Sequence, residues 1–384
     1  MSHLLFFDDT PSFGGHEVMT FEYLRGICRQ GTHEITVMYY EGNAHIEEKI
    51  GAMVSDGLPV RSAGMPFCYT PARSLFPVLA ASDILRIARA IRSLSPDVLI
   101  AVQGNIEISS AGVVAAKLAG TKVVSYLPLA QSMRSMGLRH GRIRDFFDRL
   151  YYNLPDRYVT ISKRQKDLLV KRGIGGENVD IVHNCIDMAG LSRIGKGEAR
   201  SRLGLEGTPY HFGTVGRIAV KHKGQDFLLH AIAQAREILE GVRFVFVGEG
   251  PDQGQVEALI NRYRLQDVVT LLPWQADPST VYSALDAVVI PSFFEGVPLV
   301  MLEAVYYGIP VVGSSIDGIA EFLPAAWRFA PGSVPELVDR LRFVMGNDQS
   351  DLVLETNREF RGLFFRENPH REFLHSVLRN SVRG

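Results

Sequence analysis

The sequence predicts an α/β protein made of two Rossmann-like, doubly wound domains that face each other across a cleft. Short apolar runs alternate with amphipathic segments along nearly the whole chain, as in parallel strands buried on both faces and joined by helices. The 384 residues amount to roughly two to three domains of usual size. The alternation lapses between residues 187 and 210, where Gly, Ser and charged residues gather, so we expect the linker there.

The elements follow this alternation in order. In the first half we expect strands at 3–7, 34–40, 97–103, 122–127, 157–161 and 179–183, and helices at 18–29, 81–94, 108–118, 141–153 and 163–171. In the second half we expect strands at 212–215, 243–247, 268–272, 287–290 and 310–313, with helices between them. The predicted domains are 1–187 and 188–360. Helical segments fill the end of the chain, with a break near 368–369.

Composition excludes several classes of protein. Lys and Arg number 41 against 42 Asp and Glu, so the charge expected of a nucleic-acid binder is missing. The three cysteines form no C-x-x-C pair, which argues against a disulfide framework or a zinc site and favours a reducing compartment. The start of the chain fits a strand better than a signal peptide, and no apolar run approaches the ~20 residues that span a bilayer. We therefore expect a cytoplasmic protein.

The most informative segment runs from 291 to 322. Glu295 follows an apolar strand, and Glu303 lies eight residues further on, within a helix expected to begin near Pro298. A lone helical Glu is usually solvated, but the neighbours of Glu303 are apolar, so its carboxylate needs a partner such as a ribose hydroxyl. The helix N-terminus around Gly296, Val297, Pro298 and Leu299 offers free backbone N–H groups, which the proline itself lacks, to a hydroxyl-rich or phosphorylated ligand.

Basic residues and glycines follow another strand. Gly216 permits close approach of a ligand to the backbone, while Arg217 and Lys223 are placed to converge on one anion such as a diphosphate. Taken alone, the same residues also fit two solvated basic side chains. In the first half, Gly14 and Gly15 form a strand-to-helix loop whose N–H groups suit a phosphate or a sugar, although many such turns contain glycine for steric reasons.

Together these motifs resemble the large family of retaining GT-B glycosyltransferases that contain the E-x7-E motif. The resemblance rests on Arg217 with Lys223, the Gly-Glu-Gly-Pro turn at 248–251, the pair Glu295 and Glu303, and the Gly-Ile-Pro-Val-Val run at 308–312. It extends over nearly the whole chain and is strongest from 212 to 323. It implies transfer of a hexose-type sugar from a nucleotide-diphosphate sugar to an acceptor hydroxyl, in bacterial cell-surface glycan, lipopolysaccharide or glycolipid synthesis. It also implies a final helix, 361–384, that crosses back to the N-terminal domain.

The resemblance assigns roles to particular residues. Arg217 and Lys223 would bind the donor diphosphate, Glu303 the ribose, and Glu295 with the following amides the donor sugar. Gly14 and Gly15 would close over the phosphates, and the base would lie against the segment that ends at Trp274. Gly216 and Gly248 complete the donor site. The base, UDP or GDP, stays undecided.

One family feature is missing. Relatives commonly carry a histidine at the end of the strand that here ends at Leu127, and this sequence has none there. His16 is a candidate substitute, although a histidine in a glycine loop is more often a polar surface residue. Asp8 and Asp9 lack the spacing of a metal–nucleotide motif and are interpreted as turn residues, so we expect neither a metal nor a cofactor.

The segment 131–152 has two interpretations. It interleaves five arginines with large apolar residues, which fits a helix that rests on anionic lipid at the inner leaflet and so serves a lipid-linked acceptor. It equally fits a surface helix with an ordinary core stripe.

Two rival functions remain open. One is a nucleotide-sugar-binding relative without catalysis, suggested by the missing histidine. The other is a dinucleotide-dependent oxidoreductase, suggested by the turn after the strand ending at Val247, although its third glycine comes one residue late.

Overall fold

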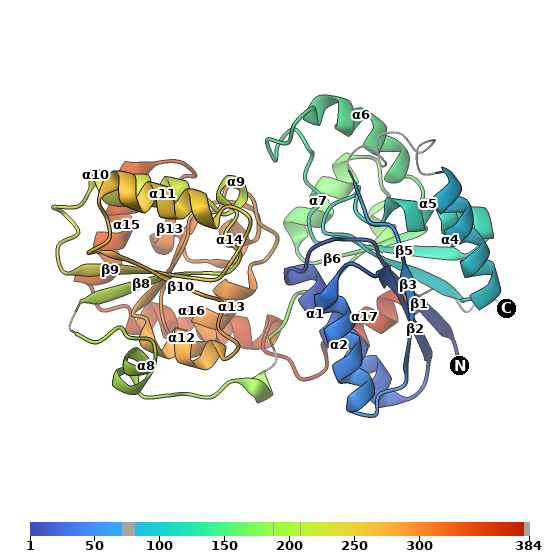
Figure 1. Cartoon of the computed structure of the whole chain (residues 1–384), viewed down its shortest axis with the longest axis horizontal. Helices are drawn as coiled ribbons and strands as arrows, with labels where there is room; N and C mark the ends of the chain where they lie inside the picture. Colours follow the sequence, from blue (N-terminus) through green and yellow to red (C-terminus); the bar gives the residue numbers. More distant parts are fainter. Residues whose placement is uncertain (71–80, 187, 208, 380–384) are drawn as a thin grey trace. The chain divides into compact units, whose positions relative to one another are not determined.

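The computed structural model describes residues 1–70, 81–186, 188–207 and 209–379 (Figure 1). The chain forms two compact units. The first comprises Met1–Asn184 and the chain from Asn368 onward, and the second comprises Cys185–Glu367. The predicted boundaries, 187/188 and 360/361, lie three residues after the first division and seven before the second. Within the described residues, no helix is long and apolar enough to cross a membrane.

The N-terminal unit contains a seven-stranded sheet in the order β3-β2-β1-β4-β5-β6-β7, and its recorded strand pairs are parallel. Strands β1 and β4 in its centre are almost entirely buried, as continuous apolar runs require. The strands are β1 (His3–Asp8), β2 (Glu34–Tyr40), β3 (Val60–Met65), β4 (Val98–Val102), β5 (Lys122–Tyr126), β6 (Arg157–Thr160) and β7 (Val179–Ile181).

Helices cover the sheet of the N-terminal unit. On one face, Ile87 and Ile91 of α4 join Val113 of α5 in an apolar cluster with the strands. The described helices are α1 (Gly15–Gln30), α2 (Ala44–Ser55), α4 (Ala81–Leu94), α5 (Ser110–Ala119), α6 (Gly141–Tyr151), α7 (Lys163–Lys171), η2 (Gly176–Asn178) and α17 (Pro369–Leu378).

Helix α17 belongs to this unit although it follows the whole of the second. The Phe373 ring stacks on Tyr23 of α1, with ring centroids 4.3 Å apart. Gln30 Nε2 lies 2.8 Å from His370 Nε2, and a Cβ atom at Gly26 would lie 2.1 Å from the His370 ring, so α1 needs a glycine where α17 crosses it. Close packing and a polar contact therefore hold the last helix against the first.

The C-terminal unit contains a six-stranded sheet in the order β10-β9-β8-β11-β12-β13, again with parallel pairs. The two parallel sheets confirm the predicted fold class of two Rossmann-like domains. The strands are β8 (Tyr210–Val215), β9 (Val242–Val247), β10 (Val269–Leu272), β11 (Ala287–Ile290), β12 (Val311–Ser314) and β13 (Arg328–Phe329). Its helices are η3 (Met188–Gly190), α8 (Lys196–Arg202), α9 (Val220–Lys223), α10 (Gln225–Gln234), α11 (Gln253–Tyr263), α12 (Pro278–Ala284), α13 (Leu299–Tyr307), α14 (Asp317–Phe322), η4 (Ala325–Trp327), α15 (Val334–Gly346) and α16 (Ser350–Leu363).

Three local predictions need correction. The segment 187–210 is not wholly irregular, because α8 lies in it and is tied to β11 by the pairing of Arg200 with Asp286 at 2.5 Å. Helix α2 and strands β3 and β13 were not predicted. Pro298 is the N-cap of α13 and not a residue of its first turn, so the helix begins at Leu299.

Candidate donor-binding site

The carboxyl ends of β8 and β9 approach each other through two glycines. Gly216 and Gly248 have φ angles of 119° and 138°, in the region that only glycine adopts readily. A Cβ atom at Gly248 would lie 2.2 Å from the carbonyl oxygen of Gly216. The Gly216 N–H donates to the carbonyl of Val247 at 2.9 Å. These turns therefore require glycine for close backbone packing, which is independent of any ligand.

Lys223 and Glu295 form an ion pair in this unit. The Lys223 Nζ lies 2.5 Å from Glu295 Oε1. Helix α9 ends at Lys223, and Gly224 then turns the chain with φ of 68°, so close to β11 that a Cβ atom there would lie 2.2 Å from the Pro291 carbonyl oxygen. This close approach brings the end of α9 to the loop that carries Glu295.

The surroundings of Glu295 favour its charged form. The carboxylate is 6% exposed and accepts a second hydrogen bond from Ser292 Oγ at 2.8 Å. Burial alone would raise the pKa of Glu295, but Lys223, His222 and the hydrogen bonds to its oxygens together lower it below its ordinary value. Glu295 is therefore a buried carboxylate that stays ionised beside a cation.

Two further groups lie close to this ion pair. The His222 ring stacks on Phe294 with centroids 4.2 Å apart, and burial lowers the pKa of His222 to about 4, so its imidazole is neutral at pH 7. The charge of Arg217, whose side chain is exposed, contributes a little to the lowered pKa of His222. The structure thus brings Lys223 and Glu295 together at one loop and leaves the Arg217 side chain at the surface.

Glu303 lies one turn inside α13 and contacts a tyrosine of the preceding helix. The hydroxyl of Tyr282 donates to Glu303 Oε2. Burial raises the pKa of Glu303, and the bond from Tyr282 only partly opposes this. Glu303 therefore differs from Glu295, because no cation among the described residues pairs with its carboxylate.

Burial and hydrogen bonds to α14 fix the backbone that precedes α13. Val297 is 3% exposed, and the carbonyl of Gly296 accepts from the Gly318 N–H at 2.9 Å. The Glu295 N–H donates to Asp317 Oδ2 at 3.3 Å. Pro298 caps the helix without a side-chain hydrogen bond, and Leu299 begins it. The first N–H groups of such a helix have no partner inside it, so this end suits a polar ligand.

Trp274 lies two residues beyond β10 and is 67% exposed. An aromatic ring that exposed has a free face on which a planar base stacks well. The structure therefore leaves the predicted contact with the base open to a ligand, in the same unit as Glu295 and Glu303.

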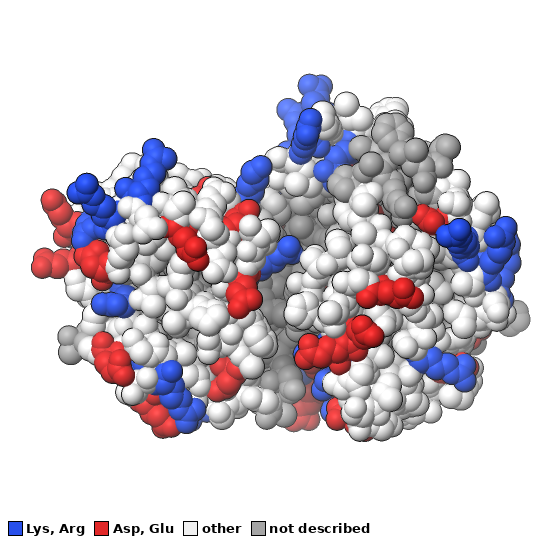
Figure 2. Space-filling view, in the orientation of Figure 1, with Lys and Arg blue, Asp and Glu red and all other residues white. Residues whose placement is uncertain are grey.

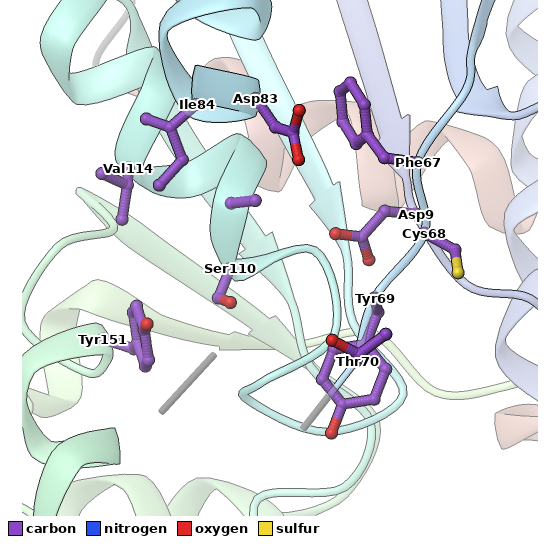
Figure 3. Close-up of a pocket in the computed structure, with 11 residues that line it drawn as sticks. Asp9, Phe67, Cys68, Tyr69, Thr70, Asp83, Ile84, Ser110, Val114 and Tyr151 are labelled. Carbon is purple, nitrogen blue, oxygen red and sulfur yellow. The ribbon is translucent and has the colours of Figure 1, made fainter. Parts of the chain in front are cut away.

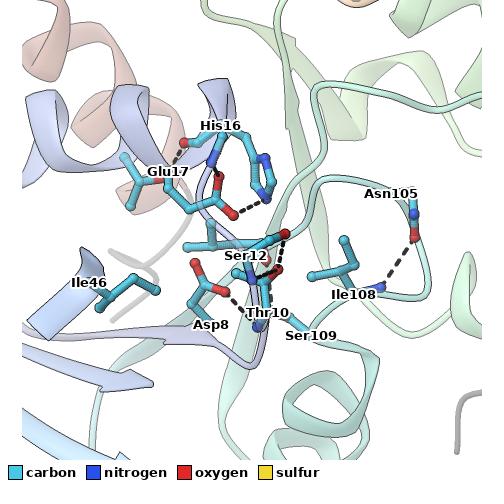
Figure 4. A network of polar contacts seen from close by, with 12 residues as sticks. Asp8, Thr10, Ser12, His16, Glu17, Ile46, Asn105, Ile108 and Ser109 are labelled. Carbon is cyan, nitrogen blue, oxygen red and sulfur yellow. Dashed lines mark hydrogen bonds and ion pairs between the residues drawn. The ribbon is translucent and has the colours of Figure 1, made fainter. Parts of the chain in front are cut away.

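The N-terminal unit carries the predicted glycine loop between β1 and α1 (Figure 4). Gly14 is the N-cap of α1, and its N–H donates to Glu17 Oε2 at 2.7 Å. Glu17 Oε1 lies 2.7 Å from His16 Nε2. A Cβ atom at Gly104 would lie 2.7 Å from the His16 ring, so the imidazole packs against the loop that follows β4. His16 is thus part of a buried polar cluster, although a surface position is the usual one for a histidine in such a loop.

Two carboxyl groups share this cluster. Asp8 at the end of β1 accepts from the Thr10 N–H at 3.0 Å, and burial, followed by the charge of Glu17, holds the pKa of Asp8 well above its ordinary range. Asp8 is the last residue of β1, and its bond to the N–H two residues further on is of the Asx-turn kind. No group of three or more His, Cys, Asp or Glu side chains in the described ranges is arranged to hold a metal ion.

A small pocket also opens in the N-terminal unit, beside Asp9 and Asp83 (Figure 3). Tyr69 lines it and donates to Glu107 Oε2 at 2.5 Å. Arg144 of α6 pairs with the same carboxylate, which is completely buried. Sequence patterns gave no sign of this network, because its members lie 37 and 38 residues apart.

The segment 131–152 is partly core and partly surface. Arg144 belongs to the core through Glu107, and Met133 is completely buried, so these two residues do not belong to a lipid-facing stripe. On the outer side of α6, Ile143, Phe146 and Leu150 are 54%, 63% and 65% exposed. Figure 2 shows basic side chains gathered over the end of this unit where Figure 1 places α6.

The sequence did not anticipate several residues of this site, among them Ser292, Tyr282 and Glu17. Glu17 has a weak signal, since an acid three residues after an N-cap glycine is a helix-start pattern. Ser292 lies three residues before Glu295, between that residue and the end of β11. No sequence signal points to Tyr282, because it is 21 residues from Glu303 and reaches it only through the packing of α12 on α13.

Comparison with known proteins finds matches to glycosyltransferases in both halves of the chain. Residues 13–189 match the family described as glycosyltransferase family 4, and residues 209–347 match the family described as glycosyl transferases group 1. A D-inositol 3-phosphate glycosyltransferase of Segniliparus rotundus is 37% identical over 43% of this chain and 41% of that protein. A 2-deoxystreptamine glucosyltransferase of Streptomyces kanamyceticus is 28% identical over 67% of this chain and 70% of that protein.

The matches to the first three curated relatives span only about two fifths of their length. Among solved structures, Anabaena HepE in complex with UDP and glucose superposes with a TM-score of 0.79 and 17% identity, over 98% of this chain and 99% of that chain. That likeness extends to the fold of both units. Two glycosyltransferase family models therefore match this chain, family 4 over residues 13–189 and group 1 over residues 209–347, and its fold is that of the solved glycosyltransferase structures.

Proposed function

We propose that this protein transfers a hexose-type sugar from a nucleotide-diphosphate sugar to an acceptor hydroxyl, with retention of anomeric configuration. The observation that carries the proposal is the ion pair of Lys223 with the buried carboxylate of Glu295. A cation held against a buried, ionised carboxylate beside the free N-terminus of α13 suits an anionic ligand that also bears hydroxyl groups.

The chemistry follows from charge. When the bond between the sugar and the diphosphate breaks, negative charge grows on the departing phosphate oxygen. Arg217 and Lys223 stabilise that charge, and one fixed donor in such a position contributes on the order of 3 kcal/mol to lowering the barrier. The departing phosphate then accepts the proton of the attacking hydroxyl on the same face of the sugar. Cationic side chains take the part that a metal ion plays elsewhere, so we expect activity without added metal.

The remaining residues of the site bind the donor. Glu303 accepts hydrogen bonds from the ribose, and Trp274 stacks on the base. Glu295 and the backbone from Gly296 to Leu299 contact the donor sugar. In the N-terminal unit, the contact of Gly14 and Gly15 with the phosphates and the part of His16 remain predictions.

The comparisons guide the choice of substrate. HepE was solved with UDP and glucose, and the two curated relatives are named for an inositol phosphate and an aminocyclitol acceptor. UDP-glucose is therefore the first donor to test, with GDP-sugars next. We propose a glycan or lipid-linked acceptor, in the synthesis of a bacterial cell-surface glycan or glycolipid.

A donor panel tests the proposal. UDP-, GDP- and ADP-sugars are screened for a thermal shift, since a ligand at 100 times its dissociation constant stabilises a protein by about 2.7 kcal/mol. Donor hydrolysis and transfer are then measured with and without EDTA. Activity that survives EDTA and is lost in Lys223→Ala supports the proposal. Donor binding without turnover indicates a non-catalytic relative. Tight NADH binding with no shift for any nucleotide sugar favours the oxidoreductase.

We also propose that the outer face of α6 rests on anionic lipid at the cytoplasmic leaflet. Ile143, Phe146 and Leu150 project from it, beside the exposed Arg142 and Arg149. Co-sedimentation with vesicles of phosphatidylglycerol and phosphatidylcholine tests this, with phosphatidylcholine alone as reference. Phe146→Ser should weaken binding to the anionic vesicles, whereas Val54→Ser, at an equally exposed residue of α2, should not. Equal binding of both variants contradicts the proposal.

A further inference from the structure

Tyr282 is an almost completely buried tyrosine whose hydroxyl meets a carboxylate of the candidate site. Its side chain is 1% exposed, and its ring stacks on Tyr307 with centroids 5.4 Å apart and planes 18° from parallel. The hydroxyl donates to Glu303 Oε2. Stacking fixes the ring, so the position of the hydroxyl is fixed as well, and with it one oxygen of Glu303.

Glu303 has little other support from the protein. Within the described part of the chain, the Tyr282 hydroxyl is the only group that the structure shows donating to its carboxylate, and Oε1 receives no hydrogen bond. Glu303 is partly buried, and a carboxylate withdrawn from water is stabilised in its ionised form by each further donor that it gains. Since the Tyr282 hydroxyl has taken Oε2, the other oxygen is left for a ligand.

We propose that Tyr282 is a positioning residue that turns Glu303 so that Oε1 accepts from the ribose 2′-hydroxyl, which makes the site selective for ribonucleotides over 2′-deoxyribonucleotides. The inference rests on the donor site described under the proposed function. A carboxylate with both oxygens free can rotate to suit either sugar. Held by Tyr282, it presents one oxygen in one direction, and a bound 2′-deoxynucleotide leaves that oxygen without a donor.

The experiment compares dissociation constants of UDP and 2′-deoxy-UDP, and of GDP and 2′-deoxy-GDP, by titration calorimetry. In the wild type we expect the ribonucleotide to bind about 10 to 100 times more tightly, as for a hydrogen bond to a charged group. In Tyr282→Phe we expect this ratio to fall at least about fivefold, through weaker binding of the ribonucleotide. The Michaelis constant for the donor should rise more than the turnover number falls.

Tyr307→Phe is the matched control. It removes a hydroxyl from the stacked partner ring, and that hydroxyl donates to the carbonyl of Ser192 at 3.0 Å and not to Glu303. We expect it to keep the wild-type ratio. If Tyr282→Phe folds poorly, p-aminophenylalanine at position 282 keeps a donor on a ring of the same shape and should restore the ratio.

The outcomes separate the two proposals. If the wild type binds none of the four nucleotides, the proposed donor site is wrong, and the proposed role of Tyr282 is wrong as well. If the wild type binds a nucleotide without preferring the ribose form, or if Tyr282→Phe keeps the full preference, the proposed function stands and the inference on Tyr282 is wrong.

Discussion

The ammonium group of Lys223 lies 2.5 Å from the carboxylate of Glu295, across 72 residues of sequence. Each side chain supplies the charge that the other needs in a site where Glu295 is 6% exposed. A diphosphate that approaches Lys223 therefore meets a cation already held in position, and the ion pair links donor binding to the stability of the unit.

Lys223→Ala should lower both the rate of sugar transfer and the stability of the C-terminal unit. Transfer should fall at least about 100-fold, because one donor to the developing charge is lost. Removing the partner of a buried carboxylate should also lower the free energy of unfolding by about 1–3 kcal/mol. Kinetics and urea unfolding measure these effects. Lys221→Ala, an exposed lysine of the same short helix, should change neither, and equal effects of both variants would contradict the role of Lys223.

Gly248→Ala should destabilise the C-terminal unit by at least about 2 kcal/mol. The added methyl group would collide with the Gly216 carbonyl, and the φ of 138° is unfavourable for alanine. Gly254→Ala makes the same chemical change inside α11, where nothing lies within 4 Å, and should stabilise by about 0.5–1 kcal/mol. Thermal unfolding of both variants tests the contrast, and a neutral Gly248→Ala would show that the turn relaxes easily.

Glu17 should prove necessary for the shape of the glycine loop. Glu17→Ala leaves the Gly14 N–H without its acceptor and should cost about 1–3 kcal/mol of stability. Glu17→Gln keeps an oxygen for that N–H but removes the charge, so it should cost less. The pKa of Asp8, which Glu17 helps to raise, should then fall. Urea unfolding and a carboxyl titration followed by NMR check these effects, and equal losses in both variants would indicate that the charge, not the hydrogen bond to Gly14, matters.

Asp148 should make stability depend on pH. Burial, with the charges of Glu107 and Asp145, raises the pKa of Asp148 to about 8, while its ordinary value is near 4. Between these values the folded state holds a proton that the unfolded state has lost, so this group's contribution to stability is full below pH 4 and is lost as pH rises through 8. Asp148→Asn should reduce the fall in unfolding free energy between pH 5 and pH 8.5. Urea unfolding of the wild type and of Asp148→Asn at the two pH values measures this difference. An equal fall in unfolding free energy for both proteins would contradict the raised pKa of Asp148.

The sequence predicts the regular parts of the fold well. Strand β2 and helix α4 have the predicted bounds, because a continuous apolar run and a strong amphipathic period are local signals. Strand β3 was missed since it lies at the edge of the sheet, with Arg61 and Ser62 exposed, so it lacks a buried apolar run. Helix α2 was missed because only three of its twelve residues are buried.

The candidate site also has some features that the sequence predicts and others that it does not. Glycine turns and the spacing of two glutamates are visible in the sequence, so Gly216, Lys223, Glu295 and Glu303 could be named. The pairing of Lys223 with Glu295 and the bond from Tyr282 to Glu303 depend on how helices and loops pack, which no local pattern encodes. The same holds for Arg144, whose spacing suggests a surface helix while a buried glutamate holds it in the core.

Helix α17 lies against α1 but leaves the ribosome after the entire C-terminal unit. At about 5–20 residues per second, translating residues 185–367 takes on the order of ten to forty seconds. During that interval the apolar surface around Tyr23, which Phe373 covers in the finished protein, faces solvent or a chaperone. The nascent N-terminal unit therefore completes its packing only when translation reaches α17.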